Sequence, residues 1–384
     1  MEPNLIKISP DRKKIFQQST SIVIKVGSSL LVEDKLGAIK KKWFASFIED
    51  IIELRKLGKT VIIVSSGAIN LGRKILNLKD NDLTLEQEQA AASVGQIELS
   101  KEYQEHFKFK GFICSQVLIT LDDFTNRRRY LNCKSTLKTL LNLGVIPIVN
   151  ENDTVATDEI RFGDNDTLAG QVANLVDAER LVILTDQQGV FTKDPRKHRG
   201  ATLIDECDVN DQTLDEAASG SSGNLGRGGM NTKIKAARLA ARSGADTIIA
   251  DGLTKNIITR LAANERLGTR LSSLNSPISQ RKQWLSGSVA SCGQLVIDQG
   301  AEKKLLESGS SLLPIGVTAV NGEFSRGDLV SCVSTEGREV ARGLTNYTSE
   351  EANKIIGQAS DRLSELLGYG GDKELIHRDN LVLV

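Results

Sequence analysis

Five short apolar runs, rich in β-branched residues, recur along the first two thirds of the chain. They occupy residues 21–27, 59–67, 145–153, 180–186 and 245–252. Segments with a helical spacing of apolar residues separate them. Strands that are apolar on both faces and alternate with helices form parallel sheets buried between helices. The pattern therefore predicts an α/β fold with an open, mainly parallel sheet sandwiched by helices.

Three of the intervening segments carry clear helix signals. Residues 43–58 gather apolar side chains on one face and end at Gly58, a residue suited to the left-handed cap of a helix. Residues 166–178 begin with an acidic residue suited to an N-cap, and residues 231–244 end on another glycine. Helices are therefore expected between the apolar runs.

The regular alternation stops near residue 270. A polar stretch that contains Pro277 follows and is typical of a linker. Beyond it, short alternating segments punctuated by glycine predict a small β-rich barrel or sandwich. We place the first domain at residues 18–272, the linker at 273–288 and the second domain at 289–369.

The composition adds exclusions to this picture. The 384 residues include 49 acidic and 49 basic ones, so no overall field attracts polyanions. The five cysteines are scattered and form no C-x-x-C pair, which argues against a disulfide framework or a zinc site. The N-terminal segment lacks the apolar core of a signal peptide, and nowhere do 18 apolar residues run together. A cytoplasmic protein without a membrane span is expected.

The ends of the apolar runs should carry the chemistry, because ligands bind at the carboxyl ends of parallel strands. Lys25 lies in the first run, just ahead of Gly27, Ser28 and Ser29. A lysine that protects an edge strand from aggregation is one interpretation. The other is a phosphoryl-binding site, in which the N–H groups of the turn act beside the ammonium.

The second run ends in Ser65-Ser66-Gly67-Ala68, a strand-to-helix turn. A serine-hydrolase elbow would need the pattern G-x-S-x-G and a histidine base, and the turn lacks the first glycine. Two interpretations then remain. Either small residues at a helix N-terminus bind an anion such as a substrate carboxylate, or the turn is purely structural.

The third run leads into the most informative stretch, residues 150–170. It is rich in acidic and amide side chains, namely Asn150, Glu151, Asn152, Asp153, Asp158, Glu159, Asp164, Asn165 and Asp166. A solvated hairpin would explain such charges. However, one acidic group follows a strand directly and the other opens a helix, so both should converge on one cleft. Such groups bind a substrate ammonium or orient lysines and Mg²⁺.

The remaining signals lie in two further segments. The fourth run ends in Thr185 and Asp186, at the same predicted edge of the sheet. Residues 219–229 contain five glycines, and Lys233 follows one turn into the next helix. A loop of this kind can close over a ligand with its N–H groups near phosphate oxygens, and the lysine would point a cation at the same place. A flexible loop with a solvent-facing lysine is the alternative.

Together these motifs resemble a known family. IVIKVGSSLL, VSSGAINLGR, AAASVGQ, NENDTVATDEIRFGDND, LTDQQGVFTKDPR and GRGGMNTKIKAA are similar, in this order, to the motifs of the bacterial glutamate 5-kinase family of the amino acid kinase superfamily. The similarity covers about residues 20 to 270. The tail, with GSSLLPIGVTAVNGEFSRGDLV, resembles a PUA domain.

The resemblance implies transfer of the γ-phosphoryl group of ATP, with Mg²⁺, to the side-chain carboxylate of L-glutamate, the first step of proline biosynthesis. By matching position, Lys25 and Lys233 would neutralise the transferring phosphoryl group, and Asp166 would hold both lysines. Glutamate would be bound by Ser66, Gly67, Asn150, Asp153 and Asn165. ATP would contact Thr185, Asp186, Arg227, Gly228, Gly229, Met230, Asn231, Thr232 and the two lysines. No metal-ligating residues are assigned.

The resemblance also implies partners and leaves one departure. Proline is expected as a feedback inhibitor, the chain as a homo-oligomer, and glutamyl phosphate reductase as the partner that consumes the labile product. The departure is Arg161, where the family pattern has lysine; the charge survives, but a bidentate guanidinium replaces a point charge. The role of this position in substrate binding or inhibition stays open.

Two alternatives compete with this interpretation. Another kinase of the superfamily, acting on acetylglutamate, aspartate, carbamate or UMP, is disfavoured by the N-E-N-D segment and the β-rich tail. An RNA-binding protein is conceivable because PUA domains often contact RNA. Residues 289–369 carry 11 acidic and 7 basic side chains, a net charge of −4 that opposes binding to a polyanion. RNA binding is therefore not expected to be the main function.

Overall fold

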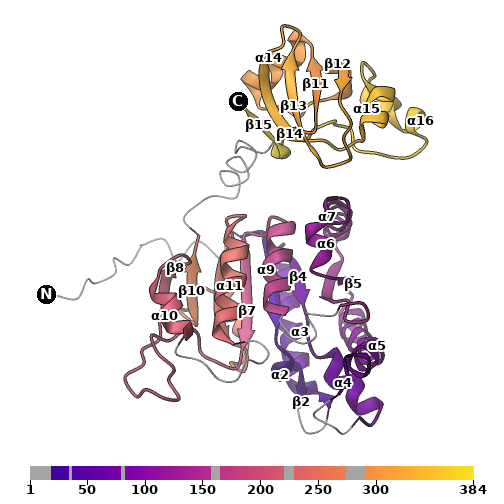
Figure 1. The fold of residues 1–384 in the computed structure, drawn as a ribbon. Helices are drawn as coiled ribbons and strands as arrows, with labels where there is room; N and C mark the ends of the chain where they lie inside the picture. Colours follow the sequence, from indigo (N-terminus) through magenta and orange to yellow (C-terminus); the bar gives the residue numbers. More distant parts are fainter. Residues whose placement is uncertain (1–18, 34–36, 79–82, 157–164, 220–228, 274–290) are drawn as a thin grey trace, which may run out of the picture. The chain divides into compact units, whose positions relative to one another are not determined.

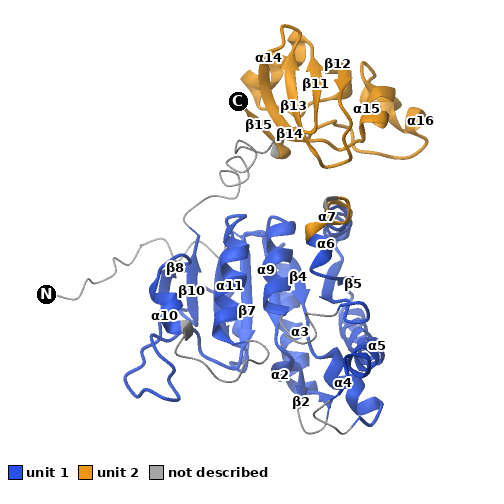
Figure 2. Cartoon of the chain, in the orientation of Figure 1, with its two compact units in different colours: residues 1–124, 133–275 blue, residues 125–132, 276–384 orange. Residues whose placement is uncertain are grey.

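The computed structural model describes residues 19–33, 37–78, 83–156, 165–219, 229–273 and 291–384. The chain divides into two compact units, drawn in different colours in Figure 2. The first consists of residues 1–124 and 133–275, and the second of residues 125–132 and 276–384. The domain boundaries expected from the sequence stay a prediction.

The first unit is built on an eight-stranded sheet with the strand order β5-β6-β4-β1-β7-β9-β10-β8. Its strands are β1 (Ser21–Val26), β4 (Thr60–Val64), β5 (Cys114–Ile119), β6 (Ile146–Glu151), β7 (Arg180–Thr185), β8 (Glu206–Asp208), β9 (Asp246–Asp251) and β10 (Thr269–Ser272). All neighbours pair in parallel except β9 with β10. A hairpin of β2 (Val32–Glu33) and β3 (Ala38–Ile39) stands apart. The predicted mainly parallel sheet is confirmed.

The five apolar runs became β1, β4, β6, β7 and β9, which are internal strands of the sheet. The edge strand β5 escaped the pattern because residues 114–118 are only half-buried or exposed. An edge strand faces a neighbour on one side alone, so its sequence need not be continuously apolar. Continuous apolar runs therefore identify the interior of a parallel sheet better than its edges.

Helices cover both faces of this sheet (Figure 1). The helices before residue 263 are α2 (Ser28–Leu31), α3 (Lys41–Lys56), α4 (Ala68–Ile75), α5 (Leu85–Phe109), α6 (Asp122–Thr125), α7 (Arg127–Asn142), α9 (Asn165–Leu175), α10 (Thr213–Ser219), α11 (Met230–Ala241) and α12 (Ile257–Ala262), and residues 125–132 of α6 and α7 belong to the second unit. Helices α3, α5 and α12 share one apolar core with alternate residues of the strands. Helices α9 and α11 lie side by side and pack on β1, β7 and β9.

Two glycines bring α4 and α5 unusually close together. A Cβ atom added at Gly95 of α5 would lie 1.8 Å from the carbonyl oxygen of Ala68, and one added at Gly72 of α4 would lie 1.7 Å from that of Ala91. Any larger residue would push the helices apart. The contact anchors the N-terminus of α4, which begins directly after the Ser65–Gly67 turn.

The second unit contains a five-stranded sheet with the order β12-β11-β13-β14-β15. Its elements are β11 (Gly293–Ile297), α14 (Gln299–Ser308), η1 (Pro314–Gly316), β12 (Val317–Asn321), β13 (Leu329–Ser334), β14 (Glu339–Leu344), α15 (Ser349–Ile355), η2 (Ser360–Arg362), α16 (Leu363–Leu367), η3 (Arg378–Asn380) and β15 (Leu381–Leu383). The unit has its own apolar core. The expected small β-rich domain is confirmed, and β15 lies beyond the predicted end at residue 369.

Neither unit supplies a membrane anchor in its described part. Among the residues that the structure describes, no helix combines the length and the apolar composition needed to cross a bilayer.

Candidate active site

Lys25 lies in the interior of the sheet. Its strand, β1, runs between β4 and β7, and the residue is only 6% exposed. The edge-strand interpretation is therefore wrong. Because side chains alternate along a strand, Ile24 and Val26 enter the core beneath α3, while Lys25 points to the face covered by α9 and α11.

A single carboxylate receives the Lys25 ammonium. Asp166, the second residue of α9, is fully buried and lies 2.5 Å from Lys25 Nζ through Oδ1. Its other oxygen, Oδ2, accepts hydrogen bonds from Lys233 Nζ at 2.9 Å and from the Thr232 hydroxyl at 2.8 Å. The carboxylate thus joins β1 to α11 rather than capping α9, the role its position had suggested.

The close crossing of α9 and α11 explains how Asp166 and Lys233 meet. A Cβ atom at Gly170 of α9 would lie 2.5 Å from the carbonyl oxygen of Ala236 on α11. Asp166 lies one turn before Gly170, and Lys233 lies one turn before Ala236, so both side chains project from the same end of this contact. A glycine inside a helical pattern, such as Gly170, can indicate a close approach of this kind, but the sequence analysis did not use it.

The cluster is charged and buried. Burial by itself would raise the pKa of Asp166, but the attraction of Lys25 and Lys233 outweighs it and lowers the pKa to about 2. The carboxylate is therefore ionised at neutral pH. Two ammonium groups and one carboxylate leave a net charge of +1 at the carboxyl end of the strands, a place suited to a phosphoryl group.

The Ser65–Gly67 turn borders the same end of the sheet. Gly67 has φ = 102°, a left-handed conformation that favours glycine, and α4 starts at the next residue. The Ser65 hydroxyl is buried and lies 3.1 Å from the hydroxyl of Tyr103 on α5. The N-terminus of α4 has no side-chain cap, so its first N–H groups can donate to an anion.

Asn150 and Asn165 link the two ends of the acidic stretch. Asn165 Nδ2 donates to Asn150 Oδ1 at 2.7 Å, to the Ser65 carbonyl oxygen at 2.6 Å and to Ser66 Oγ at 3.0 Å. The structure therefore brings Ser66, Asn150 and Asn165 together, although 15 to 99 positions of sequence separate the bonded pairs. The arrangement offers amides and a hydroxyl next to the lysine cluster.

Asp153 follows β6 and borders a hollow of about 200 Å³ at the edge of the sheet. The hollow is lined by Ala92, Ser93, Gln96, Ile97, Gln116, Leu118, Glu151, Asn152, Asp153 and Thr154. It joins the end of β6 to α5 and β5. Two carboxylates and several amides give it the polarity that an ammonium group requires.

The residues expected to contact ATP are described in part. Thr185 ends β7, is 6% exposed, and donates from Oγ1 to Asp186 Oδ1 at 3.1 Å. Gly229 precedes α11 without a side-chain cap, and Met230, Asn231 and Thr232 form the first turn of that helix. Arg227 and Gly228 lie outside the described residues, as do Asp158, Glu159, Arg161 and Asp164.

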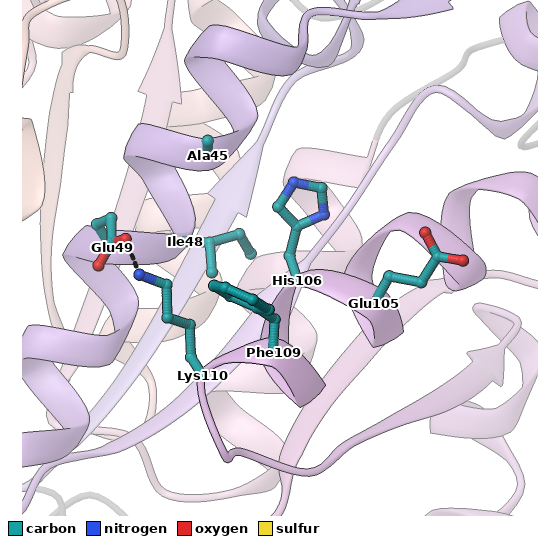
Figure 3. Close-up of a pocket in the computed structure, with 7 residues that line it drawn as sticks. All are labelled: Ala45, Ile48, Glu49, Glu105, His106, Phe109 and Lys110. Atoms are coloured by element: carbon teal, nitrogen blue, oxygen red, sulfur yellow. Dashed lines mark hydrogen bonds and ion pairs between the residues drawn. The ribbon is translucent and has the colours of Figure 1, made fainter.

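A larger hollow, of about 390 Å³, lies away from this cluster between α3 and α5 (Figure 3). It is lined by Ala45, Ile48, Glu49, Glu105, His106, Phe109 and Lys110. His106 faces the Phe44 ring edge-on, and Lys110 pairs with Glu49. Its largely apolar wall contains no cluster of groups that could polarise a phosphate, so its size does not make it the reaction site.

Sequence reasoning missed the residues that support the cluster from behind. Gln96 and Tyr103 on α5, and Gly170 on α9, touch the predicted residues or set their spacing. The segment AAASVGQ was recognised as a family motif, but nothing local showed that its glutamine reaches β6. Contacts between distant segments leave no periodic trace in a sequence.

Comparisons with known proteins give this geometry its context. Residues 20–251 match the model of the amino acid kinase family, and residues 293–367 match the PUA domain. A glutamate 5-kinase from Marinomonas sp. (strain MWYL1) is 51% identical over 97% of this chain and 99% of its own length. This chain is also similar to two further glutamate 5-kinases. The one from Pseudomonas entomophila is 52% identical over 94% of this chain and 97% of its own length, and the one from Nitrosomonas eutropha is 49% identical over 97% of this chain and 100% of its own length.

The chain belongs to the glutamate 5-kinases of the amino acid kinase family. As a kinase of this family it takes ATP as a substrate. In this glutamate 5-kinase family member, the buried Lys25–Asp166–Lys233 cluster is a group of described side chains with the charge to neutralise a phosphate. Among the described residues, no group of three or more His, Cys, Asp or Glu side chains could hold a metal ion.

Proposed function

We propose that this chain transfers the γ-phosphoryl group of ATP to the side-chain carboxylate of L-glutamate, the first step of proline biosynthesis, and that Lys25 and Lys233 stabilise the transfer. A carboxylate oxygen of glutamate forms the new bond to phosphorus, the bond from phosphorus to the β,γ-bridging oxygen breaks, and ADP leaves with that oxygen. The observation that carries the proposal is the buried Lys25–Asp166–Lys233 cluster at the carboxyl end of the strands.

The reaction needs no general base. A glutamate side chain titrates near pH 4.3, so the nucleophile is already ionised at neutral pH. The barrier comes instead from repulsion between this carboxylate and the triphosphate. Positioning and positive charge are the means of lowering it. Lys25 and Lys233 supply the charge, and Asp166, with its pKa lowered to about 2, keeps both ammonium groups in place.

Glutamate is bound by the groups beside this cluster. The Ser66–Gly67 turn at the N-terminus of α4 donates to its α-carboxylate, and Asp153, Asn150 and Asn165 accept from its α-ammonium group. These assignments leave the side-chain carboxylate directed at the two lysines. The support is their proximity: Asn165 bonds to both Ser66 and Asn150.

ATP lies across the other side of the cluster, against Thr185, Asp186 and residues 227–233. Magnesium enters with the triphosphate as part of the substrate, because Mg²⁺ keeps several waters and binds phosphate oxygens more readily than a protein cage. The described side chains offer it no such cage. Bound to ATP, the ion would neutralise phosphate charge, while the lysines act on the transferring group.

One assay tests the proposal. An acyl phosphate reacts with hydroxylamine, so ATP-dependent hydroxamate formation is measured with glutamate, acetylglutamate and aspartate in turn. Glutamate should give by far the highest kcat/KM. A preference for acetylglutamate or aspartate would replace the proposed acceptor. Asp153→Ala should raise the glutamate KM at saturating ATP, and an unchanged KM would remove Asp153 from the glutamate site.

Feedback inhibition by proline, a homo-oligomeric state, contact with a glutamyl phosphate reductase and a cytoplasmic location stay predictions. The effect of Arg161 stays open in the same way.

A further inference from the structure

A chain of hydrogen bonds leads from the proposed glutamate site to the edge of the sheet. It runs from Asn165 Nδ2 to Asn150 Oδ1 (2.7 Å), from Asn150 Nδ2 to Gln96 Oε1 (2.8 Å), from Gln96 Nε2 to Ser100 Oγ (3.2 Å) and from Ser100 Oγ to Gln116 Oε1 (2.7 Å). Every link has the donor on the side of the active site. The chain crosses from α9 through β6 and α5 to β5.

The polarity of this chain has a consequence for Asn150. The two ends of an amide have nearly the same shape, so the side chain could be turned over without a steric penalty, and its partners decide which end faces which way. Gln96 presents a carbonyl oxygen to Asn150, so Asn150 must direct its NH₂ group toward α5. Its own oxygen then faces Asn165.

Asn165 is oriented by two acceptors, namely the Ser65 carbonyl oxygen, which can only accept, and Asn150 Oδ1. Its Nδ2 is directed to Asn150, Ser65 and Ser66, which leaves its carbonyl oxygen outside these bonds. Within the described part of the chain, no residue donates to Asn165 Oδ1. An amide oxygen held in this way can accept a hydrogen bond from a substrate ammonium group. A reversed Asn165 would offer an NH₂ group there and repel it.

Burial makes the orientation costly to reverse. Gln96 is 8% exposed and Asn150 is 2% exposed, so water cannot readily replace a lost partner. If the Gln96 acceptor is removed, the buried NH₂ group of Asn150 loses its partner, and only the donor Asn165 Nδ2 still favours the original orientation. Some molecules then carry a reversed Asn150 and present the wrong end to Asn165.

Helix α5 also fixes the backbone around Gln96. The neighbouring Gly95 lies against the carbonyl oxygen of Ala68, the first residue of α4, and leaves no room for a side chain. Two turns later, the Tyr103 hydroxyl contacts Ser65 Oγ at 3.1 Å. One helix therefore touches three segments of the proposed glutamate site, which gives Gln96 a defined distance from Asn150.

We propose that Gln96 is a positioning residue that sets the affinity for the amino acid substrate by orienting the amide of Asn150, which in turn helps to hold Asn165 in place. The inference rests on the proposed function, in which these two amides bind glutamate. It assigns to the AAASVGQ motif a role in recognising the substrate ammonium group. In this role Gln96 acts through Asn150, which donates to its Oε1.

The test compares three substitutions at position 96 in the full chain. Gln96→Met removes the acceptor with little change in volume and should raise the glutamate KM about tenfold, with kcat and the ATP KM within about twofold of the unmodified protein. Gln96→Glu keeps an acceptor for Asn150 Nδ2 and should restore the glutamate KM to within about threefold. Gln96→Asn keeps the amide but withdraws it by one methylene and should behave like Gln96→Met.

A matched control is Gln104→Met, which changes an exposed glutamine on the same helix and should leave all three constants unchanged. Thermal unfolding identifies any variant that fails to fold. If Gln96→Met fails to fold, the glutamate KM of Gln96→Asn is used in its place. Three results would overturn the positioning role: an unchanged glutamate KM in the folded variant that lacks the acceptor, an equal rise of the glutamate KM and the ATP KM, or a glutamate KM in Gln96→Glu as high as in Gln96→Met. If the unmodified protein fails to phosphorylate glutamate, it is the proposed function that fails.

Discussion

Two buried aspartates lie at opposite ends of the strands of the eight-stranded sheet, and each holds two cations. At the carboxyl end, Asp166 pairs with Lys25 and Lys233. At the amino end, Asp246, the first residue of β9, pairs with Arg180 and Arg270. The two clusters look alike, but they differ in chemistry. The cations are lysines in one and arginines in the other, and the arginines also bind further partners.

The arginine cluster is closed by further partners. Arg180 also donates to Ser19 Oγ at 3.2 Å, Arg270 bonds Glu206 at 2.8 Å, and the backbone N–H of Ser273 donates to Asp246 at 2.9 Å. With Glu206 included, two cations meet two anions. The planar forks of arginine join several acceptors in fixed directions, which suits a structural role.

The lysine cluster has the opposite character. Lys25, Lys233 and Asp166 carry a net charge of +1, and an ammonium is a compact charge with three donors. An incoming phosphoryl group can share these ammonium groups with Asp166. Under the proposed function, the lysine cluster with its unbalanced charge takes an anion, whereas the arginine cluster with its balanced charges stabilises the fold.

The largest expected effect comes from a substitution in the lysine cluster at the carboxyl end of the strands. Lys233→Met should lower kcat about 100- to 1000-fold, because the ammonium acts on charge that develops in the transition state. Lys235→Met, which changes an exposed lysine two residues along the same helix, is the matched control and should leave kcat unchanged. Hydroxamate formation at saturating glutamate and ATP measures both. A higher KM with a normal kcat would show that Lys233 only binds the ground state.

The next largest effect is expected from a substitution in the arginine cluster at the amino end of the strands. Asp246→Asn removes the charge between two buried arginines and should lower the free energy of unfolding by about 3 to 5 kcal/mol, while kcat per folded molecule stays unchanged. Urea unfolding and rate measurements at low temperature separate the two quantities. Glu265→Gln, in an exposed pair with Arg260, should leave the free energy of unfolding nearly unchanged. A loss of kcat in Asp246→Asn would erase the distinction between the two ends.

A pH titration gives a smaller effect at the reactive end. The pKa of Asp166 is lowered to about 2 in the folded chain, below the ordinary value near 3.9. Its contribution to stability is therefore complete above about pH 4 and is lost as the pH falls toward 2, a change of about 2 kcal/mol. The difference in unfolding free energy between the unmodified protein and Asp166→Asn should shrink over this interval. A constant difference would contradict the paired carboxylate.

The smallest effect separates a guanidinium from an ammonium. Arg270→Lys keeps the charge but cannot bridge Asp246 and Glu206 together, so it should lower the free energy of unfolding by about 1 kcal/mol through the lost hydrogen bonds. The midpoint of urea unfolding measures the change. A variant as stable as the unmodified protein would show that the charge alone matters at the amino end.

The sequence by itself determined the class of the fold and most of the chemistry. Continuous apolar runs identified five internal strands, and the polar residues after them pointed to the edge where Lys25 and Asn150 lie. The motifs also identified the family and the second, β-rich domain. These features are local: periodicity and short motifs are properties of neighbouring residues, so they can be seen without coordinates.

Only the tertiary structure decided how these residues meet. It placed Lys25 on the face of α9 and α11, brought Asp166 to Lys233 through the crossing at Gly170, and directed Gln96 at Asn150 across 54 positions of sequence. It also revealed the arginine cluster around Asp246, which no sequence motif had indicated. The physical reason is that packing of the elements decides which distant residues meet. Such contacts recur at no fixed spacing along the chain, so they leave no pattern in the sequence.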